Sequence, residues 1–182
     1  DKSKKILKDV SFTVKPGESI ALVGPTGAGK STIVNLISRF YNVDSGRVLI
    51  DGQDISDVTI HSLRSQMGIM MQDSFIFSGT IGDNIRYGKL TASEEEIQKA
   101  SRIVCADEFI SRMPGGYDTE VRERGSMLSQ GQKQLISFAR TLLSDPSILI
   151  LDEATSSIDT RTEALVQRGM DALMNGRTVF VI

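Results

Sequence analysis

Hydrophobic and polar side chains alternate along the first part of this chain in a way that is typical of strands. Val10, Phe12 and Val14 alternate with Ser, Thr and Lys, which predicts a half-buried strand. A Lys-Pro-Gly-Glu turn at 15–18 follows, and the apolar run 19–23 comes next. We therefore expect an N-terminal antiparallel β hairpin whose second arm, 19–23, is a buried strand.

A helical pattern follows at 32–40. Four apolar side chains fall on one face of that helix: Ile33, Leu36, Ile37 and Phe40. Beyond it, the apolar runs 47–50 and 67–71 predict short strands, and 62–66 predicts a short helical piece.

The middle of the chain carries helix signals and little strand signal. Ser93 and Glu96 have the spacing of a capping box, in which each side chain bonds the backbone N–H of the other residue. The acids at 94–96 also suit the positive end of a helix. We expect this helix to continue until Met-Pro-Gly-Gly at 113–116 ends it.

The last part of the chain combines two apolar runs with one long amphipathic helix. The segment 147–151 is continuously apolar after its first residue, Ser147, as in a central parallel strand that is covered on both faces. Asp152 and Glu153 follow directly, at the carboxyl end of a strand, where α/β sheets bind ligands. A helix at 159–173 and a final strand at 177–182 complete the pattern.

One stretch in the first half carries a specific chemical signal, the spacing G-x-x-x-x-G-K-[ST] of a phosphate-binding loop. Its glycines allow backbone angles that other residues avoid, Lys30 brings a positive charge to the phosphates, and Ser31 offers a hydroxyl to Mg²⁺. A chance match in a chain of this size is roughly a one-per-cent event. The residues expected to bind nucleotide are Gly24, Pro25, Thr26, Gly27, Ala28, Gly29, Lys30, Ser31 and Thr32.

These patterns together predict an α/β fold. A P-loop NTPase core with a mostly parallel sheet would be formed by 1–79 and 144–182. A helical subdomain at approximately 80–143 would be inserted into this core. It would contain a second capping box, Ser129 with Gln132, at the start of another amphipathic helix.

Composition narrows the class of protein further. The chain has 182 residues and a net charge of −2 without a long basic run, so nothing favours nucleic acid as a partner. Its single cysteine, Cys105, has no intramolecular disulfide partner, and we expect it to be a small buried residue. No apolar run approaches the ~20 residues that a membrane-spanning helix needs.

The motifs resemble those of the ATP-binding cassette (ABC) family over essentially the whole chain. They follow in the family's order: Walker A at 24–31, the Q-loop glutamine Gln72, the signature at 128–132, Walker B at 148–153 and the D-loop at 156–159. Residues 74–81 and 119–125 resemble the exporter branch. The resemblance implies an ATPase at the cytoplasmic face of a membrane, joined to the transmembrane domain of a transporter.

The resemblance also assigns roles to site residues, with ATP as substrate and Mg²⁺ as cofactor. Asp152 would hold Mg²⁺ together with Ser31, and Gln72 would contact both Mg²⁺ and the attacking water. Glu153 would be the general base, with Lys30 on the phosphates. The signature would face the nucleotide of a second cassette, identical or not, through Ser129, Gly131 and Gln132.

Some positions depart from the family pattern. Gln130 and Arg122 stand where the family usually has glycine, and the only histidine, His61, is in the wrong place for the switch histidine. We expect His61 at the surface. Residues 1–8 hold no aromatic side chain to stack on adenine. We therefore expect a piece of a longer protein that binds nucleotide but by itself hydrolyses it poorly.

Two other classes share part of this pattern. Repair and chromosome-organising ATPases carry the signature, but a long coiled coil precedes it, and 72–128 shows no sustained heptads. A regulatory or degenerate nucleotide-binding half with little turnover is the second alternative. Glu153 argues against such degeneracy.

Overall fold

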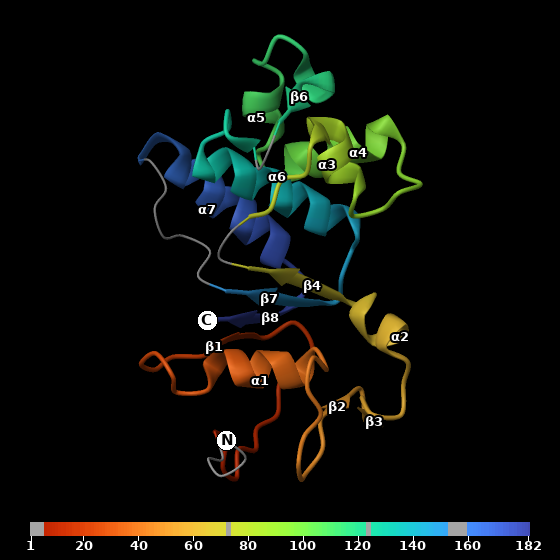
Figure 1. Cartoon of the computed structure of the whole chain (residues 1–182), viewed down its shortest axis with the longest axis vertical. Helices are drawn as coiled ribbons and strands as arrows, with labels where there is room; N and C mark the ends of the chain where they lie inside the picture. Colours follow the sequence, from red (N-terminus) through yellow and green to blue (C-terminus); the bar gives the residue numbers. More distant parts are fainter. Residues whose placement is uncertain (1–5, 72–73, 123–124, 153–159) are drawn as a thin grey trace.

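A parallel four-stranded sheet crosses the middle of the molecule (Figure 1). The computed structural model describes residues 6–71, 74–122, 125–152 and 160–182. The strands lie in the order β1 (Ser19–Ala21), β8 (Thr178–Val181), β7 (Ile148–Leu151) and β4 (Met67–Met70). All three neighbouring pairs are parallel, so the carboxyl ends of the four strands share one edge of the sheet.

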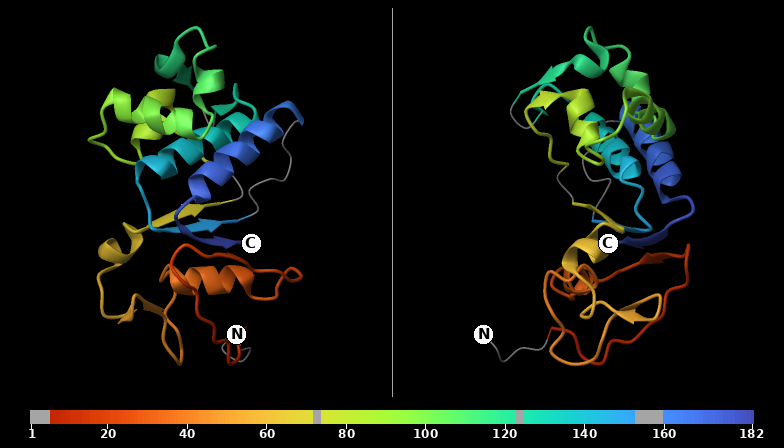
Figure 2. Two further views of the ribbon diagram at one scale, coloured as in Figure 1. Left: turned by 180° about the vertical axis from the view of Figure 1, so that it is seen from behind. Right: turned by 90° about the vertical axis from the view of Figure 1, so that its right-hand side faces the viewer.

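Helices cover both faces of this sheet, and Figures 1 and 2 show this from three sides. α1 (Lys30–Ile37) packs on one face, where Val34 and Ile37 join Ile150 and Phe180 in a core cluster. α6 (Gln130–Leu143) and α7 (Thr160–Met174) cover the other face. There Leu149, Leu151 and Val179 belong to the larger cluster, with Leu135 and Phe138 of α6. The apolar run 148–151 thus buries side chains on both sides, as the sequence predicts for a central strand.

Beyond α6 lies a lobe of short helices. It comprises α3 (Ile81–Arg86), α4 (Glu94–Ile103), α5 (Asp107–Ile110) and the 3₁₀ helix η1 (Gly116–Asp118). The capping box of Ser93 and Glu96 is confirmed at the start of α4, and Thr80 with Asp83 forms another at the start of α3. This lobe shares its apolar cluster with the sheet, through α6. The subdomain boundaries near 80 and 143 remain predictions.

α4 ends earlier than the sequence predicts, because the backbone turns at Cys105. That residue takes a left-handed φ of 62°, and the amide of Ala106 donates to the carbonyl of Ser101 at 2.8 Å. This is the closing bond of a Schellman turn, in which glycine usually takes the left-handed position. Cys105 is partly rather than fully buried. A second, short helix, α5, then precedes the Met-Pro-Gly-Gly stretch.

The predicted N-terminal hairpin does not form. Residues 10–14 have no strand structure, and Val10 and Phe12 are 52% and 49% exposed. A strand does form within the predicted range 19–23, but β1 spans only Ser19–Ala21 and lies at an edge of the sheet. It is not fully buried, so the prediction of a buried strand was wrong. Antiparallel pairs occur instead between β2 (Leu49–Ile50) and β3 (Gln53–Asp54), and between β5 (Gly79–Thr80) and β6 (Glu120–Val121).

The remaining short element is α2 (Ile60–Arg64), close to the predicted helical piece. Its Arg64 lies over the ring of Phe40, 4.3 Å from the centroid. Phe40 is 52% exposed and does not belong to the buried face of α1, contrary to the prediction. His61 is exposed, as expected. Among the described residues, no helix is both long and apolar enough to cross a bilayer.

Candidate functional site

The phosphate loop connects β1 to α1 at the carboxyl edge of the sheet. Its glycines adopt backbone angles that side chains disfavour, with φ of 153° at Gly24, 83° at Gly27 and 94° at Gly29. Gly29 is buried, and a Cβ atom there would lie 2.8 Å from Cδ2 of Leu7. Glycine is therefore required at position 29, because any other residue would have a strained backbone and a Cβ atom too close to Leu7.

The side chain of Lys30 folds back over this loop. Its Nζ donates to the carbonyl oxygens of Gly24 at 2.7 Å and Pro25 at 3.0 Å. The ammonium group is thereby held at the loop instead of extending into solvent. A phosphate at the loop would meet this charge in place, as the sequence predicts for Lys30.

The first turn of α1 adds a second attraction for an anion. The N-cap residue is Gly29, which has no side chain to cap the helix, and the first turn carries no acidic residue. The first N–H groups of an α-helix have no partner within the helix, and its N-terminus carries a partial positive charge. A phosphate at the predicted loop would meet both this partial charge and the ammonium group of Lys30.

The predicted magnesium ligands Ser31 and Asp152 come from different parts of the fold. Ser31 is exposed in the first turn of α1, beside the loop. Asp152 directly follows β7, and its amide donates to the carbonyl of Met70 at 2.9 Å, which fixes its backbone at the same edge of the sheet. Within the described part of the chain, no group of three or more His, Cys, Asp or Glu side chains could hold a metal. One hydroxyl and one carboxylate fit Mg²⁺, which takes few protein ligands and completes its shell with phosphate and water.

Two predicted catalytic residues lie outside the described residues. Gln72 follows Met71, just beyond the end of β4, and Glu153 follows Asp152. Their roles remain predictions. The two residues follow β4 and β7 in the sequence, and these parallel strands end at the same edge of the sheet as β1.

The signature residues lie at the N-terminus of α6. The capping box is confirmed: Ser129 Oγ accepts from the amide of Gln132 at 3.2 Å, and Gln132 Oε1 accepts from the amide of Ser129 at 2.9 Å. Gly131 is buried in the first turn, and Ser129 is exposed. The side chains of Ser129 and Gln132 are thus both engaged in the cap, and the contacts of these residues and of Gly131 with nucleotide remain predictions.

The signature and the phosphate loop of the same chain are not brought together. α1 packs on one face of the sheet and α6 on the other. In Figure 1 both helices begin on the left side of the molecule, at different levels, with the sheet between them. A nucleotide on the loop of one chain therefore lies away from that chain's own signature.

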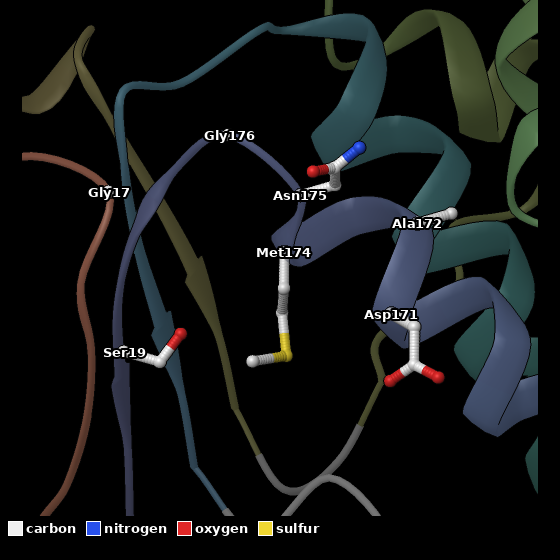
Figure 3. Close-up of a pocket in the computed structure, with 7 residues that line it drawn as sticks. All are labelled: Gly17, Ser19, Asp171, Ala172, Met174, Asn175 and Gly176. Atoms are coloured by element: carbon white, nitrogen blue, oxygen red, sulfur yellow. The ribbon is translucent and has the colours of Figure 1, made fainter.

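A hollow of about 450 Å³ lies elsewhere, beside the C-terminal end of α7 (Figure 3). Gly17, Ser19, Asp171 and Asn175 are among the residues that line it. Gly17 and Asn175 precede β1 and β8, so the hollow is at the amino edge of the sheet. None of its lining residues is a predicted site residue.

Comparison with known proteins gives consistent results along the chain. A family model described as ABC transporter matches residues 7–156. The uncharacterized ABC transporter ATP-binding protein YknV of Bacillus subtilis is 58% identical over 100% of this chain and 30% of its own length. The fatty acid ABC transporter ATP-binding/permease protein of Mycobacterium tuberculosis is 51% identical over 97% of this chain and 28% of its own length.

A solved structure agrees with these sequence relatives. The structure of a bacterial Atm1-family ABC exporter with ATP bound has a TM-score of 0.89 and 50% sequence identity. The match covers 100% of this chain and 32% of that one. The chain thus spans about 30% of the length of the first curated relatives it matches.

The fold, the phosphate loop and the signature helix define the nucleotide-binding domain of an ABC ATPase. The chain belongs to the ABC transporter family, and the relatives that it matches are named as ATP-binding proteins of that family. The predicted fold class and family are confirmed.

Proposed function

We propose that this chain is the ATP-driven motor of an exporter-type ABC transporter, which moves its substrate across a membrane. The observation that carries the proposal is the loop itself, where Lys30 Nζ is held on the carbonyls of Gly24 and Pro25 beside an uncapped helix N-terminus. This arrangement provides fixed positive charge for the phosphates of ATP.

Hydrolysis proceeds by in-line attack of water on the γ-phosphate. Glu153 takes the proton of that water, and Gln72 orients it. Ser31 and Asp152 would hold Mg²⁺, which would supply positive charge to the phosphate oxygens. Most of the rate enhancement then comes from positioning and from charge that is already in place.

A second cassette completes each site. Because Ser129 and Gly131 lie away from the loop of their own chain, we assign them to the nucleotide held by a partner cassette related by a two-fold axis. Two nucleotides are then enclosed between two cassettes. The family membership and the ATP-bound exporter with TM-score 0.89 support this assembly.

The membrane partner is a transmembrane domain of the same transporter, with this domain on the cytoplasmic side. Support comes from relatives that are named ATP-binding/permease proteins and from the 28% of such a relative that this chain covers. Most of the length of that relative lies outside the matched region.

The experiment that tests this proposal uses Glu153→Gln in the full-length protein in lipid vesicles. The variant should bind ATP with wild-type affinity and lose turnover and transport, because an amide cannot accept the proton. Asp51→Asn, a carboxylate in the β2–β3 turn away from the site, is the matched control and should keep both activities. Near-wild-type ATP hydrolysis by Glu153→Gln would contradict the assignment of the general base.

A further inference from the structure

One arginine of α6 holds backbone oxygens that belong to another part of the chain. Arg140 Nε donates to the carbonyl of Asn84 at 2.7 Å, and Nη1 donates to the carbonyl of Phe75 at 3.0 Å. Nη2 donates to Oδ1 of Asn84 at 3.1 Å. Three donors of one rigid, planar group are therefore aimed at two segments that are 56 and 65 residues away in sequence.

Asn84 carries the connection further. It is 1% exposed, and its Oδ1 also accepts from the amide of Phe77 at 2.9 Å. Its Nδ2 donates to the carbonyls of Phe77 at 2.9 Å and Thr80 at 3.0 Å. Both donors and both acceptor positions of this buried amide are used, so the segment 75–80 is fixed to α3 and to Arg140.

Side-chain packing adds to these hydrogen bonds where the segment 75–77 meets α6; we call this contact the junction. The guanidinium of Arg140 lies 5.3 Å from the ring centroid of Phe77, which stacks on Tyr87 with centroids 4.4 Å apart. The next residue, Gly88, approaches α6 so closely that a Cβ atom there would overlap the carbonyl of Arg140. The segment 75–77 therefore has little freedom to shift relative to α6.

At the junction, Arg140 binds backbone oxygens and, among the described residues, does not form an ion pair. Within the described ranges, no carboxylate forms a salt bridge with Arg140, and carbonyl oxygens receive its donors. Burial lowers the pKa of Arg140, but an arginine stays charged at neutral pH. A lysine at this position would keep the charge and lose the fork that reaches several acceptors at once.

We propose that Arg140 is a positioning residue that locks the segment 75–77 to α6, so that this segment and the signature helix move as one body. The inference rests on the proposed function, in which Gln72 serves the chain's own nucleotide and Ser129 serves the partner's. Gln72 lies three residues before Phe75, and Ser129 is the N-cap of the helix that carries Arg140. Approach of the signature to the partner's nucleotide then sets the position of the segment that follows Gln72.

The test is Arg140→Lys in the full-length protein, compared with Arg177→Lys. Arg177 is the control, since it also donates to carbonyls, of Pro146 at 3.0 Å and Leu173 at 2.9 Å. It differs from Arg140 in one ion pair, with Asp145 at 2.9 Å, whose carboxylate is exposed. It lies between α7 and β8, away from both the Q-loop segment and the signature. Both variants lose hydrogen bonds and should lower thermal stability by similar amounts. A loss of catalysis in Arg140→Lys alone can then be assigned to lost positioning and not to lower stability.

Only Arg140→Lys should change catalysis. We expect kcat for ATP hydrolysis to fall about 10- to 100-fold with KM within about twofold, because misplacement affects the transition state more than binding. Hydrogen exchange at the Phe77 amide, which bonds Asn84 Oδ1, should become at least about tenfold faster. Arg177→Lys should leave both quantities at wild-type values.

The two measurements, ATP hydrolysis and hydrogen exchange at Phe77, separate failure of this inference from failure of the proposed function. If the wild-type protein itself hydrolyses no ATP, the proposed function is wrong, and the exchange of Phe77 still decides whether Arg140 fixes the segment. Unchanged exchange, or equal loss of kcat in both lysine variants, would overturn the inference. If Arg140→Lys does not fold, Arg140→Gln replaces it, since its side-chain amide keeps two donors and lacks both the charge and the guanidinium fork.

Discussion

Lys30 illustrates how a single residue serves both the fold and the chemistry of the loop. Its ammonium group bonds two loop carbonyls, at 2.7 and 3.0 Å, and the same group is the charge that a phosphate would meet. Lys30→Ala removes the two hydrogen bonds within the loop and the positive charge. We expect ATP affinity to fall by about 2 kcal/mol, the usual size of a charge-assisted contact, which is about 30-fold.

Titration calorimetry with Mg-ATP measures this change directly. Lys15→Ala, at an exposed turn before β1, is the control and should leave the affinity unchanged. Unchanged affinity in Lys30→Ala would remove Lys30 from the phosphate site.

Local sequence predicts the residues of the loop well because their chemistry is local. The glycines, Lys30 and Ser31 follow one another, so spacing alone identifies them. Arg140 and Asn84 gave no such signal. Their bonds join positions 56 residues apart, and only the packing of α3 against α6 brings them together. The sequence shows an asparagine and an arginine in helical stretches, but the burial of Asn84 and its contact with Arg140 appear only in the structure.

At the scale of elements, the capping box of α4 makes a pH-dependent prediction. Glu96 Oε1 accepts from Lys89 Nζ at 2.5 Å, and Oε2 accepts from the amide of Ser93 at 2.8 Å. The bond from Lys89, then that from Ser93, lowers the pKa of Glu96 below its ordinary value of 4.5. A carboxylate with a lowered pKa stabilises the fold above its unfolded pKa, and this contribution is lost as pH falls through the folded value.

The measurement is the free energy of unfolding of wild type and Glu96→Gln between pH 7 and pH 3. Wild type should be more stable at pH 7, and the difference should shrink below pH 4.5, the ordinary value of this carboxyl. Glu95→Gln, an exposed neighbour in the same helical turn, is the matched control. A difference between wild type and Glu96→Gln that does not depend on pH would show that the carboxylate charge is not what stabilises α4.

Elements with strong local signals were predicted correctly, and elements that depend on their neighbours were not. The caps of α4 and α6 and the apolar run of β7 are local and appear as expected. Residues 10–14 have strand-like alternation, but β1 is an edge strand whose described neighbour is β8 alone, so no partner strand pairs with them. The end of α4 was missed because Cys105, not glycine, takes the left-handed position there.

At the scale of the whole molecule, one apolar cluster links the helical lobe to the sheet. Ile85 of α3 and Ile97 of α4 share it with Leu149 and Leu151 of β7, and Phe138 of α6 lies between them with 0% exposure. The signature helix is thus part of the core that also positions Asp152. A motion of the lobe must therefore carry α6 with it or break this packing.

In the proposed two-cassette assembly, the phosphate loop of one chain meets the signature of the other, a contact that cannot form within one chain. The phosphate loop and the N-terminus of α6 lie on opposite sides of the sheet but open toward the same side of the molecule (Figure 1). Two copies related by a two-fold axis would bring the loop of one copy to the signature of the other. A cross-link between Thr26→Cys and Gln130→Cys should then form between chains and not within one chain.

The experiment uses full-length protein with its other cysteines replaced, including Cys105→Ser, and with Glu153→Gln to retain ATP. One copy carries Thr26→Cys and the other Gln130→Cys, so a bismaleimide of about 8 Å can join them only across an interface. A covalent dimer should appear with Mg-ATP and be much weaker without nucleotide, since ATP binds at the closed interface. A copy that carries both cysteines serves as the internal comparison. If its two cysteines join within one chain, or if ATP produces no covalent dimer of the two singly substituted copies, Ser129 does not reach the nucleotide of a second copy.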